Sequence, residues 1–159
     1  MSNNPPKSDN SEPSASEALT RNILSQQNAT ARIVQCEKYL SFATYLLDQL
    51  RQAQRRLRLA AGRPLSAEDR EEAAALEQLW KQLCDGKLVE QPGQVLEDSF
   101  VDEAEAEMER LDWIDKSAAA VQAREAWREV ARLVRRCRQA RMEGESLVAS
   151  LSAVGQCSL

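Results

Sequence analysis

The sequence predicts an all-α protein: three or four elongated, coiled-coil-like helices behind a disordered N-terminal tail. Ala, Leu, Glu, Gln and Arg dominate the composition, and these residues are strong helix formers. The 159 residues include only five glycines and five prolines, which leaves long uninterrupted stretches. Aromatic residues make up 4%, so side chains for a large globular core are scarce. This mixture favours long helices over a mixed α/β fold.

The first 14 residues are predicted to form the disordered tail. After the initiator Met, residues 1–13 have no large apolar side chain that could offset the entropy lost on ordering. The stretch "SASE" follows, with Ser14 three residues before Glu17, which is the pattern of a helix capping box. The same pattern also resembles an acidic-directed kinase site. The cap is favoured because a periodic apolar run begins at once, so a helix is expected over about 15–61.

The expected first helix carries an apolar seam. Its members are spaced alternately by three and four residues, as in a coiled coil: Ile33, Cys36, Leu40, Ala43, Leu47, Leu50, Gln54 and Leu57. Gln54 interrupts the seam with a polar side chain. A helix of this length extends about 70 Å at 1.5 Å per residue. Because packing supplies most helical stability, this seam must be covered by another element.

The boundaries of the remaining helices are predicted from proline, glycine and helix-capping residues. Pro64 blocks continuation of the first helix, and Ser66 is a plausible N-cap, so a second helix is expected over about 66–85. No Gly or Pro occurs between 94 and 143, and a helical pattern covers about 97–152. Its apolar stripe rotates by roughly 90° along the segment, so this is either one continuous helix or two joined near 116. We expect one helical region over 15–154 and a frayed end at 155–159.

Charge is distributed in blocks. Residues 124–141 contain seven arginines and two glutamates, whereas residues 97–115 contain nine acidic residues and one arginine. On a helical projection Arg128, Arg132 and Arg135 lie opposite the apolar side. Charged flanks of opposite sign select the partner and register of paired helices. A second interpretation is that these arginines form an ordinary solvent-exposed face of the helix. Contact with nucleic-acid phosphates is the third, and the net charge of −4 disfavours it.

Several classes of function are disfavoured. Histidine is absent, which removes the commonest acid–base catalyst and metal ligand. The four cysteines, Cys36, Cys84, Cys137 and Cys157, form no close-spaced pair, and no phosphate-binding or dinucleotide-binding motif occurs. We therefore expect no enzyme activity, cofactor, metal or small-molecule substrate. No stretch approaches the ~20 apolar residues of a membrane span, and a cytoplasmic or nuclear location is expected.

These features together favour a non-enzymatic helical subunit or adaptor of a larger intracellular protein complex, of the general form found in cytoskeletal, kinetochore and trafficking assemblies. A second helix of about 20 residues covers less than half of the first, so partner helices or self-association are expected to cover the rest. The residues predicted to form the partner interface are Ile33, Cys36, Leu40, Leu47, Leu50, Leu57, Trp127, Val130 and Val134. The alternative is a nucleic-acid-associated protein that uses its Arg-rich helix faces.

Overall fold

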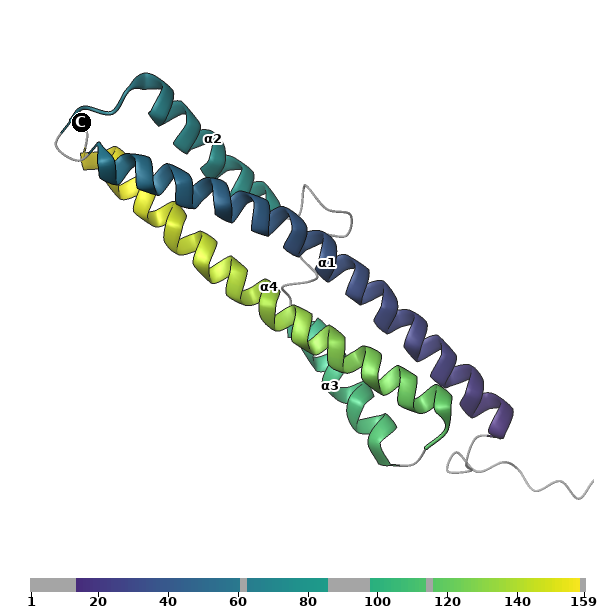
Figure 1. Ribbon diagram of the computed structural model, residues 1–159. Helices are drawn as coiled ribbons and strands as arrows, with labels where there is room; N and C mark the ends of the chain where they lie inside the picture. The colour runs from purple at the N-terminus through teal and green to yellow at the C-terminus, as the bar shows by residue number, and fades with distance from the viewer. Residues whose placement is uncertain (1–13, 61–62, 86–97, 114–115, 158–159) are drawn as a thin grey trace, which may run out of the picture.

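The computed structural model describes residues 14–60, 63–85, 98–113 and 116–157, and within these ranges all regular secondary structure is α-helical (Figure 1). It contains α1 (Ala15–Leu59), α2 (Ala67–Cys84), α3 (Asp98–Trp113) and α4 (Ala118–Cys157). The predicted all-α class is confirmed. The segment 97–152 forms two helices, which decides between the two alternatives that the sequence left open. The expected tail up to residue 13 and the last two residues of the expected frayed end lie outside the described residues.

The two long helices, α1 and α4, lie side by side and run in the same direction (Figure 1). Residues later in α1 contact residues later in α4: Ser25 lies beside Trp127, and Gln54 lies beside Ser150. The shorter helices run the opposite way. Helix α2 packs on the C-terminal half of α1, and α3 lies along the N-terminal halves of α1 and α4. The molecule is thus three helical columns, with α2 and α3 forming the third column in two pieces.

Three helix starts are fixed by serine caps. The Ser14 hydroxyl accepts a hydrogen bond from the Glu17 amide at 3.2 Å, and the Ser66 hydroxyl accepts one from the Asp69 amide at 3.1 Å. Both predicted caps are therefore confirmed. Helix α4 begins in the same way, because Ser117 accepts a hydrogen bond from the Ala120 amide at 3.3 Å. Each cap satisfies a backbone N–H that has no partner within its helix.

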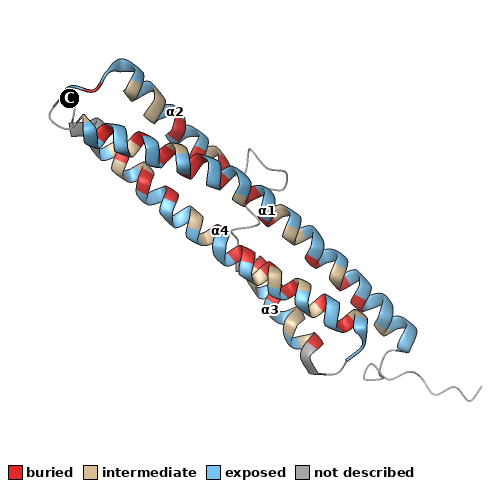
Figure 2. Ribbon diagram, viewed as in Figure 1, coloured by how far each residue is buried: buried red, intermediate tan, exposed pale blue. Residues whose placement is uncertain are grey.

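The core runs along the inner side of the two long helices (Figure 2). Cys36, Leu50, Trp127, Val134 and Cys137 are each at most 1% exposed. Burial of one large apolar side chain stabilises the fold by about 1.5–3 kcal/mol, so this continuous row supplies much of the stability. The third column adds further buried side chains, among them Trp80 from α2, and Phe100 and Leu111 from α3. The chain therefore covers the α1 seam with its own helices.

Helix α2 is seated on α4 by a close contact between Trp80 and Gly144. A methyl group added at Gly144 would lie 1.9 Å from the Trp80 ring. Trp80 is 3% exposed, so its ring has no room to move aside. The absence of a side chain at Gly144 is what allows α2 to approach this closely.

Within the part of the chain that the structure describes, no helix is both long enough and apolar enough to cross a membrane.

Candidate functional site

The residues predicted to form a partner interface lie in the core of the chain itself. Cys36, Leu47, Leu50, Leu57, Trp127, Val130 and Val134 are buried, whereas Ile33 and Leu40 are half-buried and pack against the same core. The structure thus gives these side chains an intramolecular role. Their contact with a second chain stays a prediction, and the surface that a partner can reach lies elsewhere.

Helix α1 also carries apolar side chains on the side turned away from the core. Leu19, Ile23, Val34 and Tyr45 are exposed, Tyr45 by 63%. Ile23, Val34 and Tyr45 are spaced by 11 residues, or three turns plus about 20°, so they form one line along the helix. We call these four residues the outer stripe. Two more exposed apolar residues, Leu24 and Phe42, lie at its edge, five helical turns apart.

The outer stripe has few charges around it. The only charged residues between Ala18 and Leu47 are Arg21, Arg32, Glu37 and Lys38. This low charge density was visible in the sequence, together with the 11-residue spacing. The stripe was not predicted because the more regular seam on the opposite side of the same helix dominates the apolar pattern.

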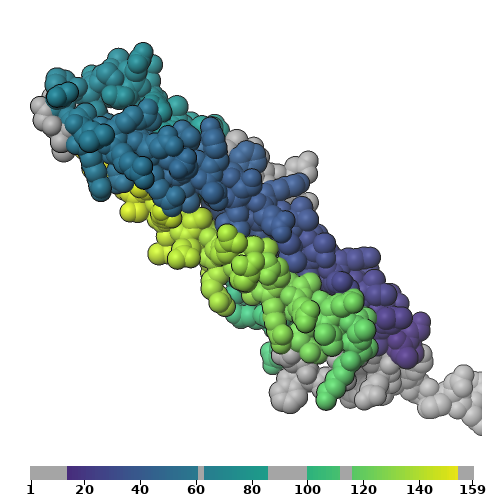
Figure 3. Space-filling model, viewed as in Figure 1, coloured from purple at the N-terminus to yellow at the C-terminus, as the bar shows by residue number. Residues whose placement is uncertain are grey.

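A groove of about 400 Å³ lies between α1 and α4, beside the outer stripe. On the α1 side it is lined by Glu37, Leu40, Ser41 and Thr44, and on the α4 side by Glu129, Arg132, Leu133 and Arg136. Ser41 precedes Tyr45 by four residues, so the groove and the stripe adjoin. Figure 3 shows the two long helices exposed side by side over the length of one face. A long surface is therefore available next to the groove.

The arginines of the predicted charged flank, Arg128, Arg132 and Arg135, are exposed on α4. Arg132 pairs with Glu129 of its own helix. Among the described residues, no ion pair joins these three arginines to Glu105 or Glu109 of α3. In the part of the chain that the structure describes, ion pairs between different helices include Arg32 with Glu103, Arg51 with Glu143, and Arg56 with Glu72. The arginine side chains on this face of α4 therefore extend mainly into solvent.

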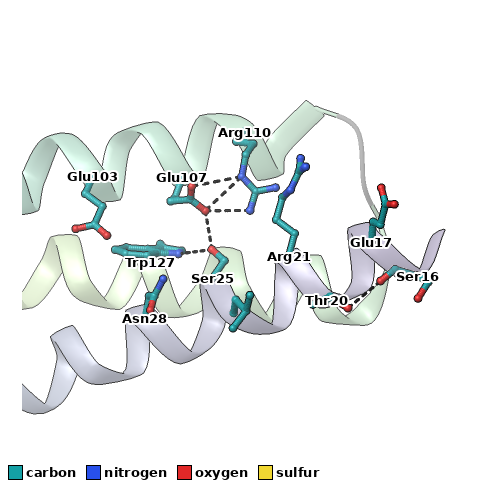
Figure 4. A pocket seen from close by; sticks show the side chains of 11 residues that line it. Ser16, Glu17, Thr20, Arg21, Ser25, Asn28, Glu103, Glu107, Arg110 and Trp127 are labelled. Atoms are coloured by element: carbon teal, nitrogen blue, oxygen red, sulfur yellow. Dashed lines mark hydrogen bonds and ion pairs between the residues drawn. The ribbon is translucent and has the colours of Figure 1, made fainter. Parts of the chain in front are cut away.

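A second hollow, of about 670 Å³, lies between α1, α3 and α4 near the N-terminal end of α1 (Figure 4). The Trp127 indole N–H donates a hydrogen bond to the Ser25 hydroxyl at 2.8 Å, and this hydroxyl donates to a Glu107 carboxylate oxygen at 2.6 Å. Arg110 donates to the same oxygen at 2.9 Å. These groups are already paired with one another, so their first role is to tie three helices together.

The charge state of Glu107 follows from these contacts. Partial burial alone would raise the pKa of this carboxyl group. The hydrogen bonds from Arg110 and Ser25 and the charge of Arg110 outweigh burial, and they hold the pKa of Glu107 below its usual value. The carboxylate is thus ionised at neutral pH and accepts hydrogen bonds from both neighbours.

The cysteines near the middle of the bundle are structural. Cys36 and Cys137 are buried, and the Cys137 thiol donates to the Cys36 carbonyl oxygen at 3.7 Å. The contact with the Cys36 thiol, together with burial, raises the pKa of Cys137, and burial raises that of Cys84. The raised pKa values keep the Cys137 and Cys84 thiols protonated, and protonated thiols are poor nucleophiles. No group of His, Cys, Asp and Glu side chains within the described ranges could hold a metal ion.

Comparisons with known proteins add no family: no protein-family model matches the chain, and no significant match was found among curated proteins or solved structures.

Proposed function

We propose that this protein is a non-enzymatic helical subunit or adaptor of a larger intracellular protein complex, and that it binds a partner protein through the outward side of α1. The observation that carries the proposal is the outer stripe: Leu19, Ile23, Val34 and Tyr45 are exposed on a helix whose other side is already buried. A helix that is apolar on both sides is typical of one that is covered on both sides. Large exposed apolar side chains that recur along one side of a helix favour an interaction site over the chance exposure of single residues.

The other helices support this assignment by contrast. On α2 the exposed large apolar residue is Leu79, and on α4 such residues are Val121 and Met142, which lie far apart in sequence. Scattered residues of this kind are normal on a protein surface and need no partner. Exposed apolar side chains are gathered on α1, which singles it out as the binding helix.

A second candidate function is association with nucleic acid through the arginines of α4. The observation in its favour is that Arg128, Arg132 and Arg135 are exposed and directed to solvent. The net charge of −4 and the lack of aromatic residues between the arginines weigh against it. Oligonucleotide binding that falls steeply with added salt, and that is abolished by reversing these three charges, would favour this alternative.

The test of the main proposal compares the proteins that co-purify from cells with three forms of the chain. The first is the wild type, and the second carries Val34→Glu with Tyr45→Glu, which places two charges on the outer stripe. The control carries Ala75→Glu with Gln78→Glu, two exposed positions of α2. We expect one set of partners to be lost only from the stripe variant, while circular dichroism shows that all three forms stay folded. An identical set of co-purifying proteins from all three would contradict the proposal.

A further inference from the structure

We infer that Cys36 of α1 and Cys137 of α4 are a redox-sensitive pair, which a small hydroperoxide converts into a reversible disulfide between the two long helices. In the reduced chain the two thiols fill space in the core. Oxidation adds a covalent bond at the same place. This inference concerns the inside of the bundle and does not depend on the proposed function.

The two thiols meet at the contact between α1 and α4. Cys36 and Cys137 are both 0% exposed, and the Cys137 sulfur lies 3.7 Å from the Cys36 carbonyl oxygen. The two side chains also contact each other through their thiols. Because α1 and α4 run in the same direction and pack along their length, this contact is part of the fold itself. Two cysteines whose side chains point toward each other meet the first requirement for a disulfide.

Small residues let the two helices approach closely at this level. Cys36 lies seven residues after Ala29 and seven before Ala43, and both alanines are 0% exposed. Cys137 lies seven residues before Gly144, which is also buried. A step of seven residues returns to the same side of a helix, so these positions follow the line of contact. A disulfide needs Cα atoms within about 4.4–6.8 Å, and helices that pack through small side chains come nearest to that separation.

The groove between α1 and α4 brings a small oxidant near the pair. Leu40 lines the groove one turn after Cys36, and Leu133 lines it one turn before Cys137. The groove of about 400 Å³ therefore spans the level of both thiols. Neither thiol has exposed surface of its own, so the oxidant must be as small as hydrogen peroxide and enters when the helices open locally.

The two thiols have different parts in the reaction. Contact with the Cys137 thiol lowers the pKa of Cys36 and outweighs burial, whereas the same contact and burial raise the pKa of Cys137. The Cys36 thiolate is therefore the nucleophile. It attacks one peroxide oxygen, the O–O bond breaks, and Cys36 becomes a sulfenic acid; the departing hydroxide takes up the proton that Cys36 released and leaves as water.

The second step forms the disulfide. The Cys137 sulfur attacks the Cys36 sulfur, the S–O bond breaks, and the departing oxygen takes the Cys137 proton and leaves as a second water. The two thiols together lose two electrons, which the peroxide gains. A reducing thiol reverses the bond by exchange, so the pair returns to its starting state.

The bond closes a long loop of the chain. Cys36 and Cys137 are 101 positions apart, and α2 and α3 lie between them in the chain. A crosslink over a long loop restricts the unfolded chain strongly and so favours the folded state. Oxidation should therefore stabilise the bundle without changing its helices.

The test uses the full-length chain with Cys84→Ala and Cys157→Ala, which leaves only the two cysteines of the proposed pair. The folded protein is treated with hydrogen peroxide, then unfolded, and its remaining thiols are alkylated and counted by mass spectrometry. We expect the count to fall from two per chain to none, with one linked fragment that contains both cysteines and the mass of a single chain. The urea midpoint should rise, and dithiothreitol should restore both thiols and the original midpoint.

Two matched variants of this chain carry Cys36→Ala or Cys137→Ala in addition. Alanine already occupies the neighbouring contact positions 29 and 43, and circular dichroism checks that each variant is folded. Neither variant should gain stability on treatment with peroxide. The wild-type chain, mapped in the same way, checks that the pair also forms when all four cysteines are present.

Several outcomes would overturn the inference. One is a thiol count that stays at two, or that falls only when the chain is unfolded in urea before oxidation. Another is a disulfide that joins two chains. A linked fragment from wild type that contains Cys84 in place of Cys36 or Cys137 would assign the oxidation to a different pair. An unchanged urea midpoint after the bond has formed would show that it does not stabilise the bundle.

Discussion

Single polar residues decide how the N-terminal end of the bundle is held together. Asn22 and Ser25 are the buried polar side chains of the described core, and both belong to α1. Ser25 accepts from the Trp127 indole and donates to Glu107, so one hydroxyl joins α1, α3 and α4. A buried indole N–H without a partner is costly, which explains a serine at this position in place of another apolar residue.

We therefore predict that Ser25→Ala lowers the free energy of unfolding by about 1–3 kcal/mol, the usual cost of leaving a buried donor unpaired. Urea unfolding followed by circular dichroism measures the change. The matched control is Ser41→Ala on the same helix, where the hydroxyl is exposed. Equal stability of the two variants would show that the Trp127–Ser25 bond contributes nothing.

The pKa of Glu107 predicts how this end of the molecule responds to acid. Because the carboxyl pKa is lower in the folded chain than its usual value of about 4.5, the ionised group contributes stability above that pH. The contribution is lost as the pH falls through the folded pKa. Glu107→Gln should therefore be less stable than wild type at neutral pH, and the gap should narrow below pH of about 4.5. Unfolding measured in urea over that range tests this, with the exposed Glu105→Gln as control. A gap that stays constant into acid would contradict the assignment.

At the scale of elements, the position of α2 depends on Gly144 of α4, where the absence of a side chain leaves room for the Trp80 ring. Alanine is a better helix former than glycine by about 1 kcal/mol, so Gly144→Ala in an isolated α4 would be stabilising. In the folded chain the added methyl group meets the Trp80 ring at 1.9 Å. The ring is rigid and buried, so relief requires α2 to move as a body.

We predict that Gly144→Ala destabilises the protein by about 1–3 kcal/mol, the range for overpacking a core. A double-mutant cycle with Trp80→Leu supplies the control, since the smaller side chain should remove the clash and restore the benefit of alanine. Thermal melts of the four forms measure the coupling. Additive effects of the two substitutions would show that Trp80 does not restrict residue 144.

At the scale of the whole molecule, the third column closes the core within one chain. The seam of α1 meets α4 along its length, and α2 and α3 cover its two halves in turn. The sequence predicted that the second helix covers less than half of α1 and that a partner covers the rest. That prediction took no account of α3 and α4 as further cover from the same chain. A second chain is not needed to bury the seam once α3 and α4 are in place.

It follows that the isolated chain should unfold in one cooperative transition whose midpoint does not change with protein concentration. A folded state that depends on association is stabilised as the concentration rises, whereas a monomer is not. Melts recorded over about a hundredfold range of concentration distinguish the two. A midpoint that rises steadily with concentration would show that the fold needs a second copy.

The sequence by itself determined the fold class, two of the helix starts and the side of each long helix that carries the core. Helix propensity, the Ser14 and Ser66 caps and the spacing of Cys36, Leu47 and Trp127 act over a few residues, so they can be read locally. The outward direction of Arg128 follows from the same periodicity.

Only the tertiary structure decided what covers each side. An apolar seam has the same spacing whether its cover comes from the same chain or from another, so Leu50 and Val134 were equally compatible with both. The burial of Ser25 depends on Trp127, 102 positions away, and the close approach at Gly144 depends on Trp80, 64 positions away. The exposure of Val34 depends on the absence of a neighbouring helix on that side. Such contacts depend on the path of the chain in three dimensions, and no local pattern carries them.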